Sequence, residues 1–187
     1  MIPDPKPRQG ARLLLRAPRA EDEQEFLSLV ASSQRLLGRW VSPPADAERF
    51  AAYLRRSQES TFEALLLVRR EDRALLGAVN LSEIVRGVFL SAYLGYWIGA
   101  PYARQGYMRE GLGLALDHAV KTLRLHRLEA NIQPANTASK RLVESLGFRR
   151  EGFSPRYLKI GGRWRDHERW AILKEDWRAT HPHSPPR

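Results

Sequence analysis

Hydrophobic residues recur along the first half of the chain with two different periods. Arg12–Arg16 is a short apolar run between arginines and is typical of a strand. Acidic residues at Glu21–Glu23 suit a helix start, and apolar residues then recur at helical spacing over two segments. Three strand-like runs follow and predict an antiparallel meander: Phe62–Val68, Leu75–Leu81 and Phe89–Ile98.

The second half of the chain alternates between helical and strand patterns. Gly106–Leu123 carries apolar residues on one helical face, and Asn136–Leu146 is a shorter helix that Gly147 ends. Further strands are expected at Leu128–Gln133, at Phe148–Phe153, and in a hairpin around Gly161-Gly162 whose second strand is Trp164–Leu173.

This order of elements predicts a mixed α/β fold. The helix that begins at Gly106 lies between two strands, so it is expected to be a crossover that makes those strands parallel neighbours. We predict one domain over residues 11–178, a mobile N-terminus over residues 1–10 and a disordered tail over residues 179–187.

Composition restricts the classes of protein and of site. The chain has 187 residues, 43% of them hydrophobic, which suits one domain with a core of its own. No apolar run approaches the roughly 18 residues that span a membrane, and the polar start lacks a secretory signal pattern, so a cytoplasmic location is expected. There is no cysteine, which excludes disulfides and thiolate chemistry, and the five histidines show no metal-binding spacing, so no metal is predicted.

The chain is strongly basic, with 31 Lys and Arg against 21 Asp and Glu and a net charge of +10. Such a charge is compatible with RNA, ribosomes, polyphosphate ligands or acidic proteins as partners. The basic residues are scattered, so an Arg-rich proteome explains the charge equally well. The five tryptophans offer no RNP signature that would identify an RNA-binding platform.

The stretch ARQGYMREGLG lies between a predicted strand and a predicted helix, where backbone amides bind anions. Gly106 would let a ligand approach the backbone, and Arg104 adds positive charge. The amides expected to face a pyrophosphate are those of Gln105, Gly106, Tyr107, Met108 and Arg109. Neither a P-loop nor a GxGxxG string is present, so a simple turn remains the alternative.

The stretch PANTASKRLVESLGF begins a second helix with a polar residue. Asn136 is a natural N-cap, and Ser139 lies one turn into the helix. On this pattern alone, Asn136 only caps the helix, and Lys140 and Arg141 are solvated charges.

Taken together, these stretches resemble the GCN5-related N-acetyltransferase (GNAT) superfamily. The matching strings are GYWIGAPYARQGYMREGL, LEANIQPANTASKRLVESLGF and YLKIGGRWRDHERWAI, and the resemblance covers roughly residues 11–177. It is nearest to the RimJ/RimL type, which acetylates the N-terminal alanine or serine of ribosomal proteins. The resemblance implies a mixed sheet of about seven strands, about four helices, and a splayed strand pair between Trp97-Ile98 and Asn131.

The resemblance also implies acetyl-CoA as the acetyl donor. The family's pyrophosphate loop then corresponds to Ala103–Met108, where Ala103 and Met108 depart from the usual polar and small residues. Because backbone amides do most of this work, Arg104 and the amides around Gly106 remain the expected phosphate ligands.

Further positions follow from the same matching. Ile98 and Asn131 are expected near the pantetheine arm, Asn136 in contact with it, Ser139 near the thioester sulfur, and Arg141 near the nucleotide phosphates.

Acyl transfer to an amine needs a base and an acid. Glu83 is the predicted base, although a solvated strand-end glutamate is the alternative. Ser139 is the predicted acid for the leaving thiolate, and Tyr157 competes for that role unless it lies at the edge of the core. Asp166 or His167 could orient the substrate, but they alternate on a strand, so at most one points into the site.

The sequence therefore predicts an acetyl-CoA-dependent N-acetyltransferase that acts on the N-terminal α-amine of a protein, with a ribosomal protein as the favoured acceptor. One alternative is an acetyltransferase of a small amine; a polyamine fits poorly with a basic chain. The other is a non-catalytic protein that binds RNA or the ribosome with this fold. Either a monomer or a homodimer is compatible with the sequence.

Overall fold

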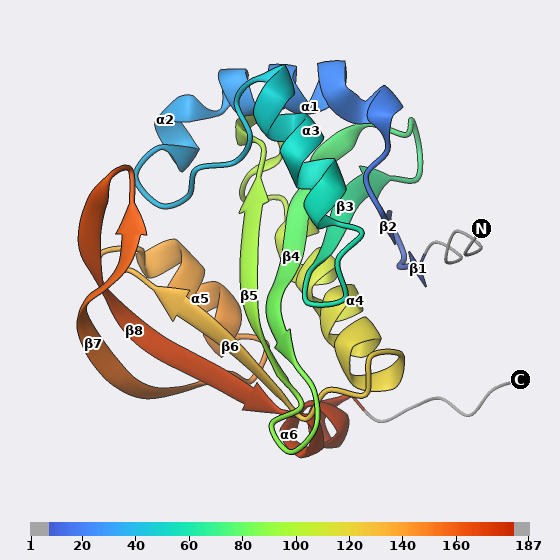
Figure 1. Cartoon of the computed structure of the whole chain (residues 1–187). Helices are drawn as coiled ribbons and strands as arrows, with labels where there is room; N and C mark the ends of the chain where they lie inside the picture. The colour runs from blue at the N-terminus through green and yellow to red at the C-terminus, as the bar shows by residue number, and fades with distance from the viewer. Residues whose placement is uncertain (1–7, 182–187) are drawn as a thin grey trace, which may run out of the picture.

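The computed structural model describes residues 8–181, in which the strands form one eight-stranded mixed sheet in the order β1-β2-β3-β4-β5-β6-β8-β7 (Figure 1). The strands are β1 (Arg8–Gln9), β2 (Leu13–Arg16), β3 (Glu63–Arg69), β4 (Leu75–Val85), β5 (Ser91–Ile98), β6 (Arg127–Ile132), β7 (Arg149–Ile160) and β8 (Arg163–Leu173). The helices are α1 (Glu23–Ser32), α2 (Gln34–Leu37), α3 (Ala47–Arg56), α4 (Tyr107–Lys121), α5 (Thr137–Glu144) and α6 (Lys174–Thr180). Two single 3₁₀ turns, Ala20–Asp22 and Ala100–Tyr102, join these elements.

The sheet confirms the predicted topology. β3, β4 and β5 form an antiparallel meander, and α4 crosses over to make β6 the parallel neighbour of β5. The pairing of β5 with β6 covers only Ser91–Tyr93 and Arg127–Glu129. Beyond that point the two strands diverge toward the end of the molecule that α2 covers, as Figure 1 shows. This divergence is the splayed strand pair that the resemblance implied.

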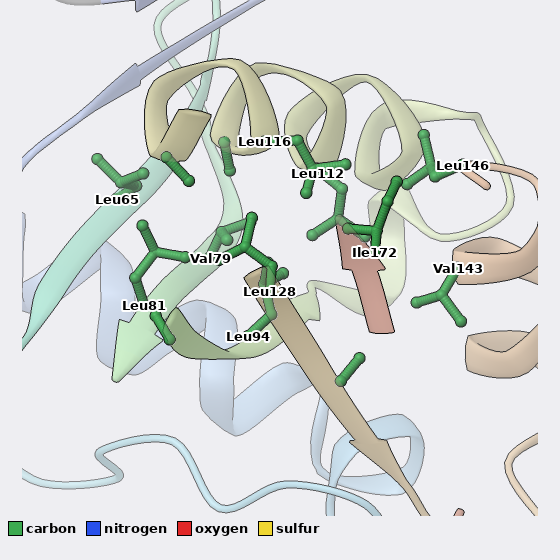
Figure 2. Packing of buried hydrophobic residues seen from close by; sticks show 14 of the residues in the cluster. Leu65, Val79, Leu81, Leu94, Leu112, Leu116, Leu128, Val143, Leu146 and Ile172 are labelled. Carbon is green, nitrogen blue, oxygen red and sulfur yellow. The ribbon is translucent and has the colours of Figure 1, made fainter. Parts of the chain in front are cut away.

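β2, β3 and the first half of β4 are buried on both faces, which explains why these strands read as continuous apolar runs. Leu13 and Leu15 of β2 pack on the face covered by α4 and α5, whereas Leu14 packs on the face covered by α1 to α3. Figure 2 shows Leu112 and Leu116 of α4 directed toward the strands of the first face. The first core contains residues of both β5 and β6, and Trp97 of β5 packs in the second.

Polar caps begin the helices where the sequence predicts them. The Asp46 carboxylate accepts a hydrogen bond from the Arg49 backbone amide at 2.8 Å, and Asn136 caps α5 in the same way. Gly106 and Gly147 both have positive φ, the first as the N-cap of α4 and the second three residues after the end of α5. These positions favour glycine because a side chain there is strained.

Two predicted strand boundaries need correction. β7 is one strand through Ile160, not a strand that stops at Phe153, because β7 lies at the edge of the sheet, where a proline such as Pro155 is tolerated. β5 begins at Ser91, since Phe89 is exposed and Leu90 has a positive φ.

The ordered domain is also longer than predicted at both ends. β1 joins the sheet within the segment predicted to be mobile and brings the strand count to eight, and α6 continues to Thr180. The rest of the predicted mobile and disordered ends, residues 1–7 and 182–187, lies outside the described residues. None of the helices within residues 8–181 has the length and apolar composition that crossing a bilayer requires.

Candidate active site

A cavity of about 530 Å³ opens where β5 and β6 diverge. Its walls are the final residues of these two strands, the loop and first turn of α4, and the first turn of α5. The lining at one end consists of Leu36, Leu37, Trp40 and Val41. His167 of β8 lines the cavity from the side of the sheet where β8 lies. The splay therefore creates a channel between two strands whose backbone groups have no ladder partner there.

The start of α4 is built to hold an anion. Gly106 caps the helix with φ of +80°, and Arg104 before it also lies in the left-handed region with φ of +62°. The amides of the first helical turn have no partner within the helix, so they and the positive end of the helix dipole face the cavity entrance. Arg104 and Arg109 line the same region and add positive charge.

Contacts with β2 fix this loop in place. The Glu110 carboxylate accepts hydrogen bonds from the backbone amides of Arg12 and Leu13, at 2.7 and 3.1 Å. The Arg12 guanidinium donates to the Gln105 carbonyl oxygen at 3.1 Å and lies over the Tyr107 ring. Because the first turn of α4 is anchored in this way, its amides are preorganised for a ligand.

The start of α5 brings two hydroxyl groups together. Asn136 Oδ1 accepts a hydrogen bond from the Ser139 amide at 3.1 Å, which orients the first turn of the helix. Ser139 Oγ lies 2.5 Å from the Tyr96 hydroxyl of β5, and both residues line the cavity. Burial raises the pKa of Tyr96 to about 12, although the hydrogen bond with Ser139 opposes the shift. Tyr96 is therefore a protonated donor at neutral pH.

Asn131 of β6 supplies an acceptor that the described residues leave unsatisfied. Its Oδ1 is buried, has no hydrogen-bond partner among residues 8–181, and belongs to a side chain in the cavity wall. A buried carbonyl oxygen without a partner costs about 1–3 kcal/mol, so a ligand N–H at this point would relieve that cost. The amides of a pantetheine arm fit this requirement.

His167 is the residue of the Asp166-His167 pair that faces the cavity. It is buried, whereas Asp166 is exposed and accepts a hydrogen bond from the Arg156 amide at 2.7 Å. The expectation that at most one of the two points inward is thus met by His167.

The structure brings most of the predicted site residues together. Those that line the cavity are Ile98, Arg104, Gly106, Tyr107, Met108, Arg109, Asn131, Asn136 and Ser139. Gln105 and Arg141 do not line it: Gln105 is exposed and its amide group donates to the Pro101 carbonyl oxygen, and Arg141 is exposed on α5. Asn136 both caps its helix and faces the cavity, so the two interpretations of that residue are compatible.

The predicted base and the competing acid lie outside the cavity wall. The Glu83 side chain is 65% exposed, and its nearest basic partner is Arg56 at 3.4 Å. Tyr157 lies on β7 beside Tyr93, whose pKa a hydrogen bond with Tyr157 raises to about 12. The solvated position considered for Glu83 and the edge position considered for Tyr157 match this placement.

Tyr96 is the functional candidate that the sequence prediction missed. It shares a strand face with Ile98, which was expected beside the channel, and residues two apart on a strand point to the same side. That spacing was the signal that could have identified it.

A second cavity, of about 360 Å³, adjoins the first across Gly95, Tyr96 and Trp97. Tyr53 and Asn80 line it and bond to each other at 2.7 Å. The two cavities thus share part of β5 as a common wall. Among the described residues, no group of His, Asp and Glu side chains is arranged to hold a metal ion.

The acetyltransferase (GNAT) domain family matches the chain over residues 12–149. The chain therefore belongs to the GNAT acetyltransferase family and is an acyltransferase of the N-acetyltransferase class. The splayed strands and the anion-binding start of α4 are the features of this chain that agree with that membership.

Relatives refine the comparison. The probable N-acetyltransferase YjcK of Bacillus subtilis is 30% identical over 176 residues, which cover 90% of this chain and 97% of YjcK. The [ribosomal protein uS5]-alanine N-acetyltransferase of Escherichia coli is 40% identical over 107 residues, which cover 57% of this chain and 55% of that enzyme.

Solved structures show the same fold. Mycobacterium smegmatis RimJ in complex with CoA-disulfide has a TM-score of 0.81 at 27% identity, covering 92% of this chain and 85% of RimJ. A spermidine N-acetyltransferase of Vibrio cholerae, in complex with CoA and spermine, has a TM-score of 0.77 at 23% identity, covering 90% of this chain and 99% of that chain. At that identity the second likeness concerns the fold alone.

Proposed function

We propose that this enzyme transfers the acetyl group of acetyl-CoA to the N-terminal α-amine of a protein. The similarity to a ribosomal-protein alanine acetyltransferase and to RimJ favours a ribosomal protein as the acceptor. The observation that carries the proposal is the charge of the cavity walls.

The walls of both cavities carry arginines and no carboxylate. Arg104 and Arg109 line the larger cavity and Arg49 and Arg56 the smaller one, while no Asp or Glu is among the described lining residues. Arg49 and Arg56 pair with Asp46 and Glu83, which lie outside the walls, at 3.4 Å each. The walls therefore offer no carboxylate of their own to a polyamine, which carries several positive charges. A protein N-terminus brings a single amine that is neutral when it reacts, so it fits these walls better.

The anchored start of α4 is the proposed pyrophosphate site. Its unpaired amides, with Arg104 and Arg109, would bind the phosphate oxygens. Ile98 and Asn131 flank the channel in which the pantetheine arm would lie, and the free Asn131 Oδ1 would accept one of its N–H groups. Asn136 would form the part of the wall nearest the thioester. Gln105 and Arg141, which are exposed at the rim, remain predicted contacts with the phosphates of the cofactor.

The pKa of the acceptor amine determines how much help the transfer reaction needs. An α-amine has a pKa of about 7.7–8.0, so an appreciable fraction is neutral at pH 7, whereas a lysine side chain at about 10.4 needs far more help. The neutral amine attacks the thioester carbon, and the sulfur leaves as a thiolate that requires a proton. Tyr96, held by Ser139 at 2.5 Å, is the proposed donor of that proton.

Thiol release from acetyl-CoA, measured with matched acceptors, tests the proposal. We expect kcat/KM for a peptide that begins with Ala or Ser to exceed that for spermidine by at least about tenfold, a difference of 1.4 kcal/mol. The same peptide with a blocked N-terminus is the control and should give no release. Faster release with spermidine, or equal release with the blocked peptide, would contradict an α-amine acceptor.

A further inference from the structure

His167 has features that the role of orienting substrate does not explain. It projects from β8 into the larger cavity, with 2% of its surface exposed, and so faces the same space as Tyr96 and Ser139. A polar ring buried to this degree needs a reason, because burial without compensation is unfavourable.

The backbone fixes the tautomer of the ring. His167 Nδ1 lies 2.9 Å from the Arg165 carbonyl oxygen, which can only accept a hydrogen bond. Nδ1 therefore carries the hydrogen, and in the neutral ring Nε2 holds the lone pair. The hydrogen bond at Nδ1 is the one that the ring makes within residues 8–181, and it leaves Nε2 to the cavity. A histidine held in this way presents a free basic nitrogen.

The other wall residues cannot supply a base at neutral pH. The remaining ionisable side chains among the described lining residues are three tyrosines and two arginines: Tyr96, Tyr102, Tyr107, Arg104 and Arg109. Tyrosine titrates near pH 10 and arginine above pH 12 in water, so both types are protonated at pH 7. Glu83 is exposed outside the wall and has Arg56 as a neighbour.

From this geometry we propose that His167 Nε2 is the general base that removes the proton from the attacking amine, a role that rests on the proposed acetyl transfer. The amine nitrogen forms a bond to the thioester carbon, and the carbon–sulfur bond breaks with its electron pair on sulfur. The amine proton passes to Nε2, directly or through one water, and the thiolate takes the Tyr96 proton. Afterwards the imidazolium releases its proton to solvent and Tyr96 regains one.

Burial keeps the His167 ring in its neutral, basic form. Burial lowers the pKa of His167 below its ordinary value, while the Arg165 carbonyl and the Asp166 carboxylate act in the opposite direction. From β7, the Tyr157 ring lies 6.2 Å from the imidazole. Glu168, the next residue on β8, is engaged with Lys140 of α5 and Arg150 of β7, at 3.3 Å each. A neutral imidazole at pH 7 follows from this balance.

The pH dependence of thiol release from the full chain tests the proposal. For an α-amine acceptor, log(kcat/KM) of the wild-type enzyme should rise with slope one below pH 8, and with slope two below the pKa of His167. We expect His167→Gln to lower kcat by about 10²- to 10⁴-fold and to leave only slope one. Because a merely structural loss would not change the number of ionisations, the slope separates the two roles.

Two controls make the result decisive. His126→Gln changes a half-exposed histidine that pairs with Glu175 at 3.2 Å, and it should keep the wild-type rate and both ionisations. Acetyl-CoA binding by calorimetry should persist in His167→Gln, which shows that the variant is folded. If that variant does not fold, the wild-type profile still decides, since a single slope of one over the whole acid limb overturns the proposal.

The test of His167 as the base can fail independently of the test of the α-amine acceptor. Wild-type enzyme that releases no thiol with any N-terminal peptide would contradict the α-amine acceptor. Wild-type turnover together with an unchanged rate and slope in His167→Gln would leave the acceptor standing and remove His167 as the base.

Discussion

At the scale of single residues, the decisive feature is a hydroxyl pair that spans two elements. Tyr96 comes from β5 and Ser139 from α5, and their oxygens are 2.5 Å apart at the wall of the channel. The sequence prediction assigned the acid role to Ser139, with Tyr157 as its competitor. The phenol of Tyr96 is the stronger acid of the pair, because a serine hydroxyl titrates far above a phenol, so Ser139 is better suited to orient it.

Replacing Tyr96 tests this assignment. Tyr96→Phe should lower kcat by about 10²-fold or more, because the thiolate loses its proton donor, while acetyl-CoA affinity stays near the wild-type value. Ser139→Ala should cost less, since it removes only the orienting partner. An assay of thiol release measures kcat, and calorimetry measures the affinity for acetyl-CoA.

Tyr157→Phe is the matched control for that series. Tyr157 lies outside the cavity wall, so removal of its hydroxyl should leave kcat close to the wild-type value. A larger loss in Tyr157→Phe than in Tyr96→Phe would reverse the assignment and return the acid role to Tyr157.

At the scale of elements, the start of α4 is the proposed pyrophosphate site and is held in place by the sheet. Its first turn is anchored by Glu110 to the backbone of β2, and Gly106 turns the chain into the helix with φ of +80°. The departures from the family signature at Ala103 and Met108 should matter little, because the proposed phosphate ligands are backbone amides and not side chains. Met108 instead packs in the core between α4 and the sheet.

Gly106→Val should weaken acetyl-CoA binding by about tenfold. A left-handed conformation costs a residue with a β-carbon about 1–2 kcal/mol, so the loop would relax and misplace its amides. Isothermal calorimetry gives the dissociation constant directly.

Gly113→Ala on the same helix is the control for that loop variant. A β-carbon at Gly113 would meet its nearest neighbour, in the Trp177 ring, only at 3.8 Å. The higher helix propensity of alanine should raise stability by about 1 kcal/mol and leave acetyl-CoA affinity unchanged. Equal affinities for Gly106→Val and the wild-type enzyme would show that the loop does not hold the phosphates.

At the scale of the whole molecule, the topology was largely predictable and the site only in part. Apolar runs such as Leu13–Leu15 read as strands buried on both faces, and the turn and cap residues Gly106, Asn136 and Gly147 were recognisable from local rules. Local sequence rules cannot predict which side chains come into contact where β5 and β6 diverge. The contact between Tyr96 and Ser139 joins residues 43 apart in sequence and depends on how far β5 and β6 diverge.

The errors have the same physical origin. The strand predicted to end at Phe153 continues to Ile160, because an edge strand does not need the backbone amide that Pro155 lacks. Strand alternation identified that either Asp166 or His167 faces inward, but only the packing of β8 against the channel selects His167. Glu83 was placed correctly near the end of the second meander strand, but its side chain points to solvent.

The central claim is that acetyl is transferred to an α-amine, and the most direct measurement is the position of the acetyl group in the product. A peptide that begins with Ala and contains one internal Lys is incubated with the enzyme and acetyl-CoA, and its fragments are then weighed by tandem mass spectrometry. The account predicts a single acetyl group on the N-terminal fragment, because only the α-amine has an appreciable neutral fraction at pH 7. Acetyl on the lysine fragment, or an unmodified peptide, would contradict it.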